Sequence, residues 1–116
     1  MRTVLVRYKT KEDQAEANAK LVRTVFDELA AQVPGGFHYV TFRLADDVTF
    51  VHLATMEGAT PLQSLPAFQT FQADIRARCV EPPVLSEATV VGSYELPEFV
   101  AVAEAKAPAA AERRAD

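Results

Sequence analysis

Three residues that could act together chemically, His52, Tyr39 and Arg43, fall on one face of a predicted hairpin. Side chains alternate along a strand, and a turn at 46–47 would bring all three to the same side. Imidazole titrates near neutral pH, so His52 could act as a general base or donate a hydrogen bond to a phenolic ligand. The alternative is that His52 is a hydrogen-bonded histidine in the core or at a subunit interface.

A guanidinium on a largely apolar strand, such as that of Arg43, could hold an anionic or phenolic oxygen. It could equally pair with an acid across a dimer interface. Nearby phenylalanines are expected to be core residues first and cavity walls second. We therefore predict a site with His52 as the catalytic residue and, as ligand-binding residues, Tyr39, Arg43, Phe50, Phe68 and Phe71.

Metal ligands and reactive thiols are sparse in the sequence. His38 and His52 point to opposite faces of the predicted hairpin, so they should not share a metal ion. Cys79 is the single cysteine, which excludes an internal disulfide and a cysteine metal cluster, and we expect it to be buried packing. The chain has neither a glycine-rich phosphate loop nor a G-x-S-x-G elbow. We expect no metal, haem or flavin cofactor.

The order of the elements follows from where the hydrophobic period changes between 2 and 3.6. It predicts strands over about 3–9, 37–44, 48–55 and 84–94, a first helix ending near 33 and a second helix starting at 64. This order is β-α-β-β-α-β, the ferredoxin-like arrangement of an α+β fold. It gives one antiparallel sheet with both helices on one face.

Local signals place the ends of these elements. Residues 10–13 read as a capping box that starts the first helix, and Ser64 reads as the cap of the second helix. Asp74 and Arg78 are spaced for an ion pair on that helix. The Pro82-Pro83 pair should end the helical region. A tight turn at 46–47 would pair Thr41 with His52 and Phe42 with Val51.

Both faces of the predicted hairpin are substantially apolar, which indicates a sheet that is covered on both sides. The helices cover one side, so we expect a homodimer built through the other. The predicted domain spans residues 1–96. Residues 97–116 are rich in alanine, and we expect a partly disordered C-terminal extension there.

Size and charge restrict the classes of function. A chain of 116 residues is expected to form one domain. A net charge of −4 argues against a nucleic-acid partner, which would need a clustered basic surface. No apolar run approaches the roughly 20 residues of a membrane span, and the N-terminus enters a strand without a leader. We expect a cytoplasmic protein with no nucleic-acid or membrane partner.

Four segments resemble the antibiotic biosynthesis monooxygenase-like domains of the dimeric α/β-barrel superfamily. They are VLVRYK (4–9), YVTFRLADD (39–47), TFVHLAT (49–55) and PAFQTF (66–71), and the resemblance covers roughly residues 2–95. It implies that two sheets meet face to face and close an eight-stranded barrel across a two-fold axis. It also implies a cavity between sheet and helices, which family enzymes use, often without flavin or metal, to oxidise an electron-rich aromatic or to degrade haem.

The family's best-known catalytic sets combine an asparagine, a tryptophan, and a histidine or arginine. Here the single asparagine, Asn18, is expected to be exposed on the first helix, and tryptophan is absent. Met56 stands where an aromatic residue is common, and the second helix offers only Arg76 and Arg78. Haem degradation is therefore disfavoured, and two hypotheses stay open. One is a cofactor-independent oxygenase-like enzyme acting on a small aromatic or polyketide-like substrate. The other is a non-catalytic dimeric module that binds a small hydrophobic ligand or supports a partner protein.

Overall fold

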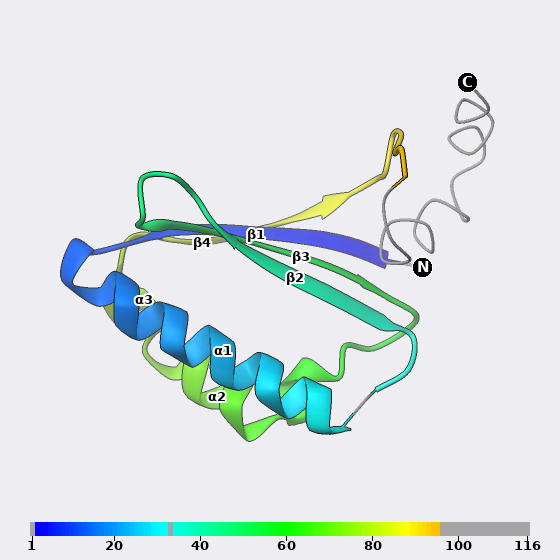
Figure 1. The fold of residues 1–116 in the computed structure, drawn as a ribbon, viewed down its shortest axis with the longest axis horizontal. Helices are drawn as coiled ribbons and strands as arrows, with labels where there is room; N and C mark the ends of the chain where they lie inside the picture. The colour runs from blue at the N-terminus through cyan, green and yellow to red at the C-terminus, as the bar shows by residue number, and fades with distance from the viewer. Residues whose placement is uncertain (1, 33, 96–116) are drawn as a thin grey trace.

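The computed structural model describes residues 2–32 and 34–95, and its elements follow the predicted order (Figure 1). The strands are β1 (Arg2–Thr10), β2 (Phe37–Arg43), β3 (Thr49–Met56) and β4 (Cys79–Ala88). The helices are α1 (Ala15–Gln32), α2 (Pro66–Ala73) and α3 (Ile75–Arg78), with short 3₁₀ turns η1 (Glu12–Gln14) and η2 (Leu62–Ser64). All strand pairs are antiparallel, in the order β2-β3-β1-β4. The ferredoxin-like α+β fold is confirmed.

The core lies between the sheet and the helical layer formed by α1 and α2, which lie side by side along one face of the sheet (Figure 1). Alternation on β1 turns Val4 and Tyr8 toward this layer, and both are buried. Helix α1 meets them with buried residues at helical spacing, including Val22 and Val25. Burying each such large side chain contributes roughly 1.5–3 kcal/mol. The sheet and α1 therefore form a rigid frame for the residues between them.

The hairpin of β2 and β3 has the predicted register, with Thr41 opposite His52 and Phe42 opposite Val51. Asp46 fixes the turn, because its carboxylate accepts hydrogen bonds from the Val48 and Thr49 amides and from the Thr49 hydroxyl. Those bonds lower the pKa of Asp46 to about 2, and the bond from the Thr49 hydroxyl has the largest effect. This register puts His52 on the face that meets the helices.

The other face of the sheet, called the open face below, carries no helix among the described residues (Figure 1). Strand pairing places a row of apolar side chains there. Phe42 and Val84 are 49% and 64% exposed. The half-buried members of the row are Leu5, Val40, Val51 and Leu53. The expectation that both faces are apolar is confirmed.

Both helix caps predicted from the sequence are wrong. Thr10 is the last residue of β1, and its hydroxyl donates to the Val48 carbonyl at 3.2 Å instead of capping a helix. Ser64 ends η2, and its hydroxyl donates to the Pro61 carbonyl at 2.9 Å. Leu65 is the N-cap of α2 instead. In each case the hydroxyl donates a hydrogen bond to a nearby carbonyl, whereas the sequence pattern predicted that its oxygen would accept one from a backbone amide of the helix.

Strand β4 begins at Cys79 rather than near residue 84, and it ends at Ala88 rather than near 94. The Pro82-Pro83 pair lies inside it, although it was expected to end a helical region. Two features of β4 make prolines acceptable there. It is an edge strand, and its pairing with β1 shifts register between Arg7 and Lys9, which is typical of a β-bulge.

Two further expectations concern the ends of the chain. The boundary at residue 96 and the alanine-rich extension lie outside the described residues. No helix within residues 2–32 and 34–95 is long and apolar enough to cross a membrane.

Candidate ligand-binding site

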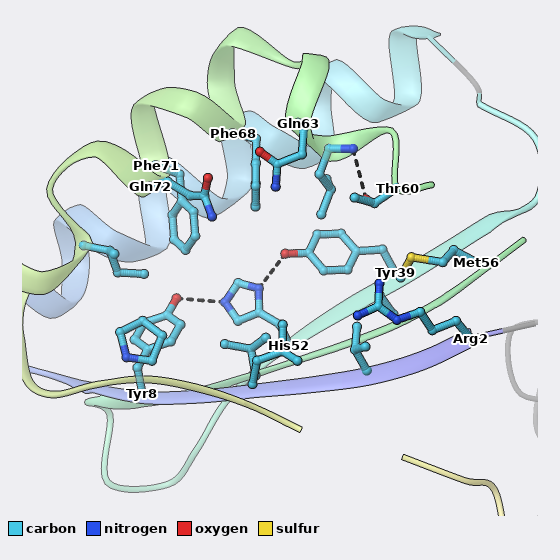
Figure 2. Close-up of a pocket in the computed structure, with 17 residues that line it drawn as sticks. Arg2, Tyr8, Tyr39, His52, Met56, Thr60, Gln63, Phe68, Phe71 and Gln72 are labelled. Carbon is cyan, nitrogen blue, oxygen red and sulfur yellow. Dashed lines mark hydrogen bonds between the residues drawn. The ribbon is translucent and has the colours of Figure 1, made fainter. Parts of the chain in front are cut away.

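A cavity of about 270 Å³ lies between the sheet and the segment from η2 to α3. Its walls are largely apolar. Figure 2 shows Phe68 and Phe71 of α2 facing the side chains of Tyr39 and His52, which rise from the sheet. On the sheet side the cavity also touches Val4, Val6, Tyr8, Ala54 and Met56. The site is therefore a mostly apolar pocket with a small group of polar side chains on the wall that the sheet forms.

His52 is the centre of that polar group and accepts or donates at both ring nitrogens. The Tyr8 hydroxyl lies 2.8 Å from its Nε2 atom, and the Tyr39 hydroxyl lies 2.6 Å from its Nδ1 atom (Figure 2). The Thr41 hydroxyl lies 3.1 Å from the same Nδ1 atom. Strand order explains the arrangement, because β3 is central and brings His52 between β1, which carries Tyr8, and β2, which carries Tyr39 and Thr41. Both ring nitrogens of the imidazole are thus hydrogen-bonded to protein side chains.

Asn18 extends this group into the helical layer, which corrects its expected exposure. The side chain is completely buried, and its Nδ2 atom donates to the Tyr8 hydroxyl at 2.9 Å. A sequence signal did exist. Asn18 stands three residues after Ala15 and four before Val22, on the buried stripe of α1. The polar type of the residue favours an exposed position, but a buried amide is stable when both of its ends are bonded.

Arg78 closes the group from the end of α3, so the predicted ion pair with Asp74 is wrong. The guanidinium turns inward and is buried, with Nε donating to Asn18 Oδ1 at 3.1 Å and Nη2 donating to the Phe71 carbonyl at 2.7 Å. The guanidinium carbon lies 5.3 Å from the centre of the Phe71 ring. These two acceptors and the ring face stabilise the buried positive charge.

Burial sets the protonation of the polar group. It lowers the pKa of His52 to about 4, so the imidazole is neutral at pH 7. It raises the pKa of Tyr39 to about 12, and it raises the pKa of Tyr8 further, with Asn18 opposing that rise. Both tyrosines therefore keep their protons and act through hydrogen bonds.

The cavity brings together four of the six predicted site residues, His52, Tyr39, Phe68 and Phe71. Phe50 and Arg43 are not on its wall.

Phe50 is buried in the core and stacks on the Tyr8 ring at 5.5 Å between centroids. Arg43 is held away from the cavity, because its guanidinium pairs with Glu16 at 3.2 Å and donates to the Asp47 carbonyl at 2.9 Å. The acid that binds Arg43 thus comes from the same chain.

Other residues singled out in the sequence take structural places. His38 is opposite Thr55 in the hairpin and projects to the open face, away from His52, as expected. Cys79 is buried at the start of β4 and belongs to the core cluster. At the edge of the cavity Arg2, which sequence reasoning missed, pairs with Glu87 at 2.9 Å. Within residues 2–32 and 34–95, no three His, Cys, Asp or Glu side chains gather where a metal ion could bind.

Solved structures share this architecture. The chain superposes on an antibiotic biosynthesis monooxygenase with a TM-score of 0.65 and 17% identity, covering 78% of this chain and 99% of that one. The protein Rv0793 from Mycobacterium tuberculosis matches with a TM-score of 0.62 and 16% identity, covering 77% and 93%. A dimeric ferredoxin-like protein of unknown function from Jannaschia sp. CCS1 matches with a TM-score of 0.58 and 16% identity, covering 77% and 98%.

No protein-family model matches the chain, and no curated protein matches it. At 16–17% identity the structural likeness establishes the fold and leaves the reaction open. The resemblance that the sequence predicted is confirmed at that level: the chain has the ferredoxin-like fold of antibiotic biosynthesis monooxygenase-like and related dimeric proteins.

Proposed function

We propose that the cavity binds a small, oxygen-bearing aromatic ligand, and that His52 and Tyr39 form the polar contact for the ligand oxygen. The observation that carries this proposal is a continuous buried polar chain that ends on the wall of an otherwise apolar cavity. Apolar residues of similar volume can often fill the space of buried charged or polar groups without loss of stability, so packing alone does not account for such a chain. Leaving any one of its members unbonded would cost roughly 1–3 kcal/mol.

The size of the cavity limits the ligand. Its volume of about 270 Å³ lies just below the roughly 300–1,000 Å³ that is typical of small-molecule pockets. The rings of Phe68 and Phe71 form one wall, and flat apolar ligands stack well on such rings. A ligand of two or three fused rings with one oxygen directed at Tyr39 satisfies both conditions.

The first candidate reaction is oxygenation without a cofactor. A reaction of this type draws its electrons from the substrate, so that a methylene and O₂ become a carbonyl and water. Its difficult step is forming the electron-rich enolate, and hydrogen-bond donors directed at the enolate oxygen stabilise it. Asn18 and Arg78 lie behind the cavity wall and reach His52 through Tyr8. The resemblance associates these residue types with the family's catalytic sets. The third type, tryptophan, is absent from the sequence.

The second candidate is binding without turnover. It is favoured by the state of His52, whose two ring nitrogens are both engaged by protein hydroxyls and whose imidazole is neutral. A general base needs a free lone pair within reach of the proton that it removes. His52 would provide one only if a ligand displaced the hydroxyl that is bonded to its unprotonated ring nitrogen.

One experiment separates the two candidates and tests the proposal. The purified protein is mixed with anthrone, a three-ring ketone with an acidic methylene, under ¹⁸O₂. An oxygenase converts it to anthraquinone that carries one ¹⁸O atom, faster than the spontaneous reaction. The His52→Gln variant should lose this acceleration, while Lys20→Gln on the exposed face of α1 should keep it. Saturable binding without acceleration supports the second candidate, and absence of both rejects the proposed site.

The proposed assembly is a homodimer joined through the open face. Its exposed apolar row is the kind of surface that monomeric proteins rarely leave uncovered. The likeness to a dimeric protein of the same fold supports this assembly. The cavity lies on the opposite side of the sheet and stays accessible in such a dimer.

A further inference from the structure

We infer that Arg78, acting through Asn18, sets the direction of the buried hydrogen-bond chain so that Tyr39 offers its hydroxyl proton to the ligand. This inference rests on the proposed function, because it names the ligand group that the same site prefers. Arg78 is a positioning residue here, because it does not contact the ligand. It acts on the ligand through a chain of hydrogen bonds that runs through Asn18, Tyr8, His52 and Tyr39. The preferred group is an acceptor oxygen, such as the carbonyl of a ketone or quinone.

The direction begins at Arg78, because a guanidinium can only donate. Its Nε atom lies 3.1 Å from Asn18 Oδ1, so the Asn18 amide has its oxygen toward Arg78. The other end of the amide, Nδ2, is a donor and lies 2.9 Å from the Tyr8 hydroxyl oxygen. A flipped amide would put two donors against each other at Arg78. The Tyr8 oxygen therefore accepts from Asn18.

The same reasoning carries through the histidine. The Tyr8 oxygen already accepts from Asn18, and its remaining hydrogen-bond partner is His52 Nε2 at 2.8 Å. Tyr8 also touches the cavity, but in the ligand-free protein the acceptor bonded to its hydroxyl is Nε2, so the Tyr8 proton is donated to Nε2. A neutral imidazole carries a single ring proton, and an Nε2 that accepts leaves this proton on Nδ1. His52 is thus the Nδ1–H tautomer.

The last step reaches the cavity. The Nδ1 atom lies 2.6 Å from the Tyr39 hydroxyl and 3.1 Å from the Thr41 hydroxyl, so its proton is directed mainly to the Tyr39 oxygen. The Tyr39 oxygen accepts this bond, and the Thr41 hydroxyl, which also bonds to Tyr39, can donate to the same oxygen. The Tyr39 proton is then left for the cavity that the side chain lines (Figure 2). A carbonyl oxygen can accept that proton. A phenol hydroxyl that points its own proton at Tyr39 meets a donor instead.

The first test reads the tautomer of His52 directly in the ligand-free protein. Two-bond ¹H–¹⁵N correlation spectra distinguish protonated from unprotonated ring nitrogens. We expect the proton on Nδ1 of His52. His38, the only other histidine, is on the open face and serves as the internal reference. A proton on Nε2 of His52 in the wild-type chain would overturn the inference, whether or not any ligand binds.

The second test reverses the chain with a nearly isosteric change, Asn18→Asp. A carboxylate at position 18 accepts from both Arg78 and Tyr8, so the Tyr8 proton turns away from His52. His52 should then become the Nε2–H tautomer, and Tyr39 should donate to Nδ1. A purely structural role for Arg78 and Asn18 predicts the same His52 tautomer in both proteins. The His38 signals should not move.

The third test measures ligand preference with two probes of similar size, 1-tetralone as the acceptor and 1-naphthol as the donor. The preference is measured as the Kd of 1-naphthol divided by the Kd of 1-tetralone. This ratio should be roughly tenfold higher for the wild-type chain than for Asn18→Asp. Tyr39→Phe should remove the preference while His52 keeps its proton on Nδ1, now shared with Thr41. A preference that survives in Tyr39→Phe would contradict the inference, and this arm holds even if Asn18→Asp does not fold.

The outcomes also separate this inference from the proposed function. If neither probe binds but His52 is the Nδ1–H tautomer and switches in Asn18→Asp, the chain has the inferred direction and the ligand site is rejected. If both probes bind equally and His52 carries its proton on Nε2, the ligand site stands and the directional role of Arg78 fails.

Discussion

His52 is buried in its neutral form, and this gives the protein a pH dependence of stability that one residue should control. An unfolded histidine titrates near 6.5, whereas folded His52 titrates near 4. As the pH falls from about 6.5 to about 4, the unfolded chain binds a proton that the folded chain does not. The free energy of unfolding should therefore fall with pH by about 3 kcal/mol across this window and stay flat above it.

Urea unfolding at a series of pH values from about 7 down to about 4 measures this slope. His52→Gln should be less stable at neutral pH, because it breaks the bridge between Tyr8 and Tyr39, and its slope in this window should shrink. Thr24→Gln, a change without a titratable group on the exposed side of α1, is the control and should keep the wild-type slope. Equal slopes in wild type and His52→Gln would show that another group causes the dependence.

At the scale of single residues, the sequence predicted that His52 and Tyr39 share one face of the hairpin, and it did not predict that Asn18 and Arg78 are buried in the same hydrogen-bonded group. His52 and Tyr39 could be paired because strand alternation and a hairpin turn are local rules. Asn18 and Arg78 are 60 positions apart in the chain, and their bond is created by packing the start of α1 against the end of α3. No rule about neighbouring residues in the sequence predicts that contact. A polar residue on an apolar stripe was the available signal, and it favours a buried, bonded side chain as much as a surface one.

At the scale of elements, the β2–β3 hairpin was predicted most closely because its turn chemistry is strong. Asp46 accepts three hydrogen bonds within the turn, and Asp47 adopts a positive φ of 66°. Asp46→Ala should lower the melting temperature, since it removes all three acceptors. Asp46→Asn should lower it less, because the amide oxygen can still accept.

Two further measurements check the role of the turn. Asp47→Gly should leave the melting temperature unchanged or raise it, because glycine adopts a positive φ without strain. The contribution of ionised Asp46 should be present above about pH 4 and be lost as the pH falls toward about 2, since its folded pKa lies below the unfolded value of 3.8. An Asp46→Ala protein as stable as wild type would show that the strands alone set the register.

Strand β4 shows where element rules fail. The Pro82-Pro83 pair predicts a boundary, because proline removes a ladder donor. The rule applies to central strands, and a position at the sheet edge cannot be read from the segment itself. The pair lies where the register shifts against β1, so the strand continues past it to Ala88.

At the scale of the whole molecule, the two faces of the sheet have different tasks. One face joins the helices and holds the cavity, and the open face presents the apolar row that includes Phe42 and Val84. These two residues lie on β2 and β4, the two edge strands, so the row spans the full width of the sheet. Burial of apolar surface contributes about 25 cal/mol per Å². A second copy of this chain, related by a two-fold axis, would bury the same row on both sides.

Light scattering should therefore give twice the 12.7 kDa mass of the chain at micromolar concentration. The double variant Phe42→Glu with Val84→Glu should give the single mass, because it places like charges on an apolar contact, while its circular dichroism should keep the α+β signature. Thr24→Glu, on the exposed side of α1, is the control for added charge and should stay dimeric. A monomer mass for the wild-type chain would contradict the proposed dimer. A double variant that remains dimeric would move the contact to another surface, and the cavity-binding tests would then need repeating on that assembly.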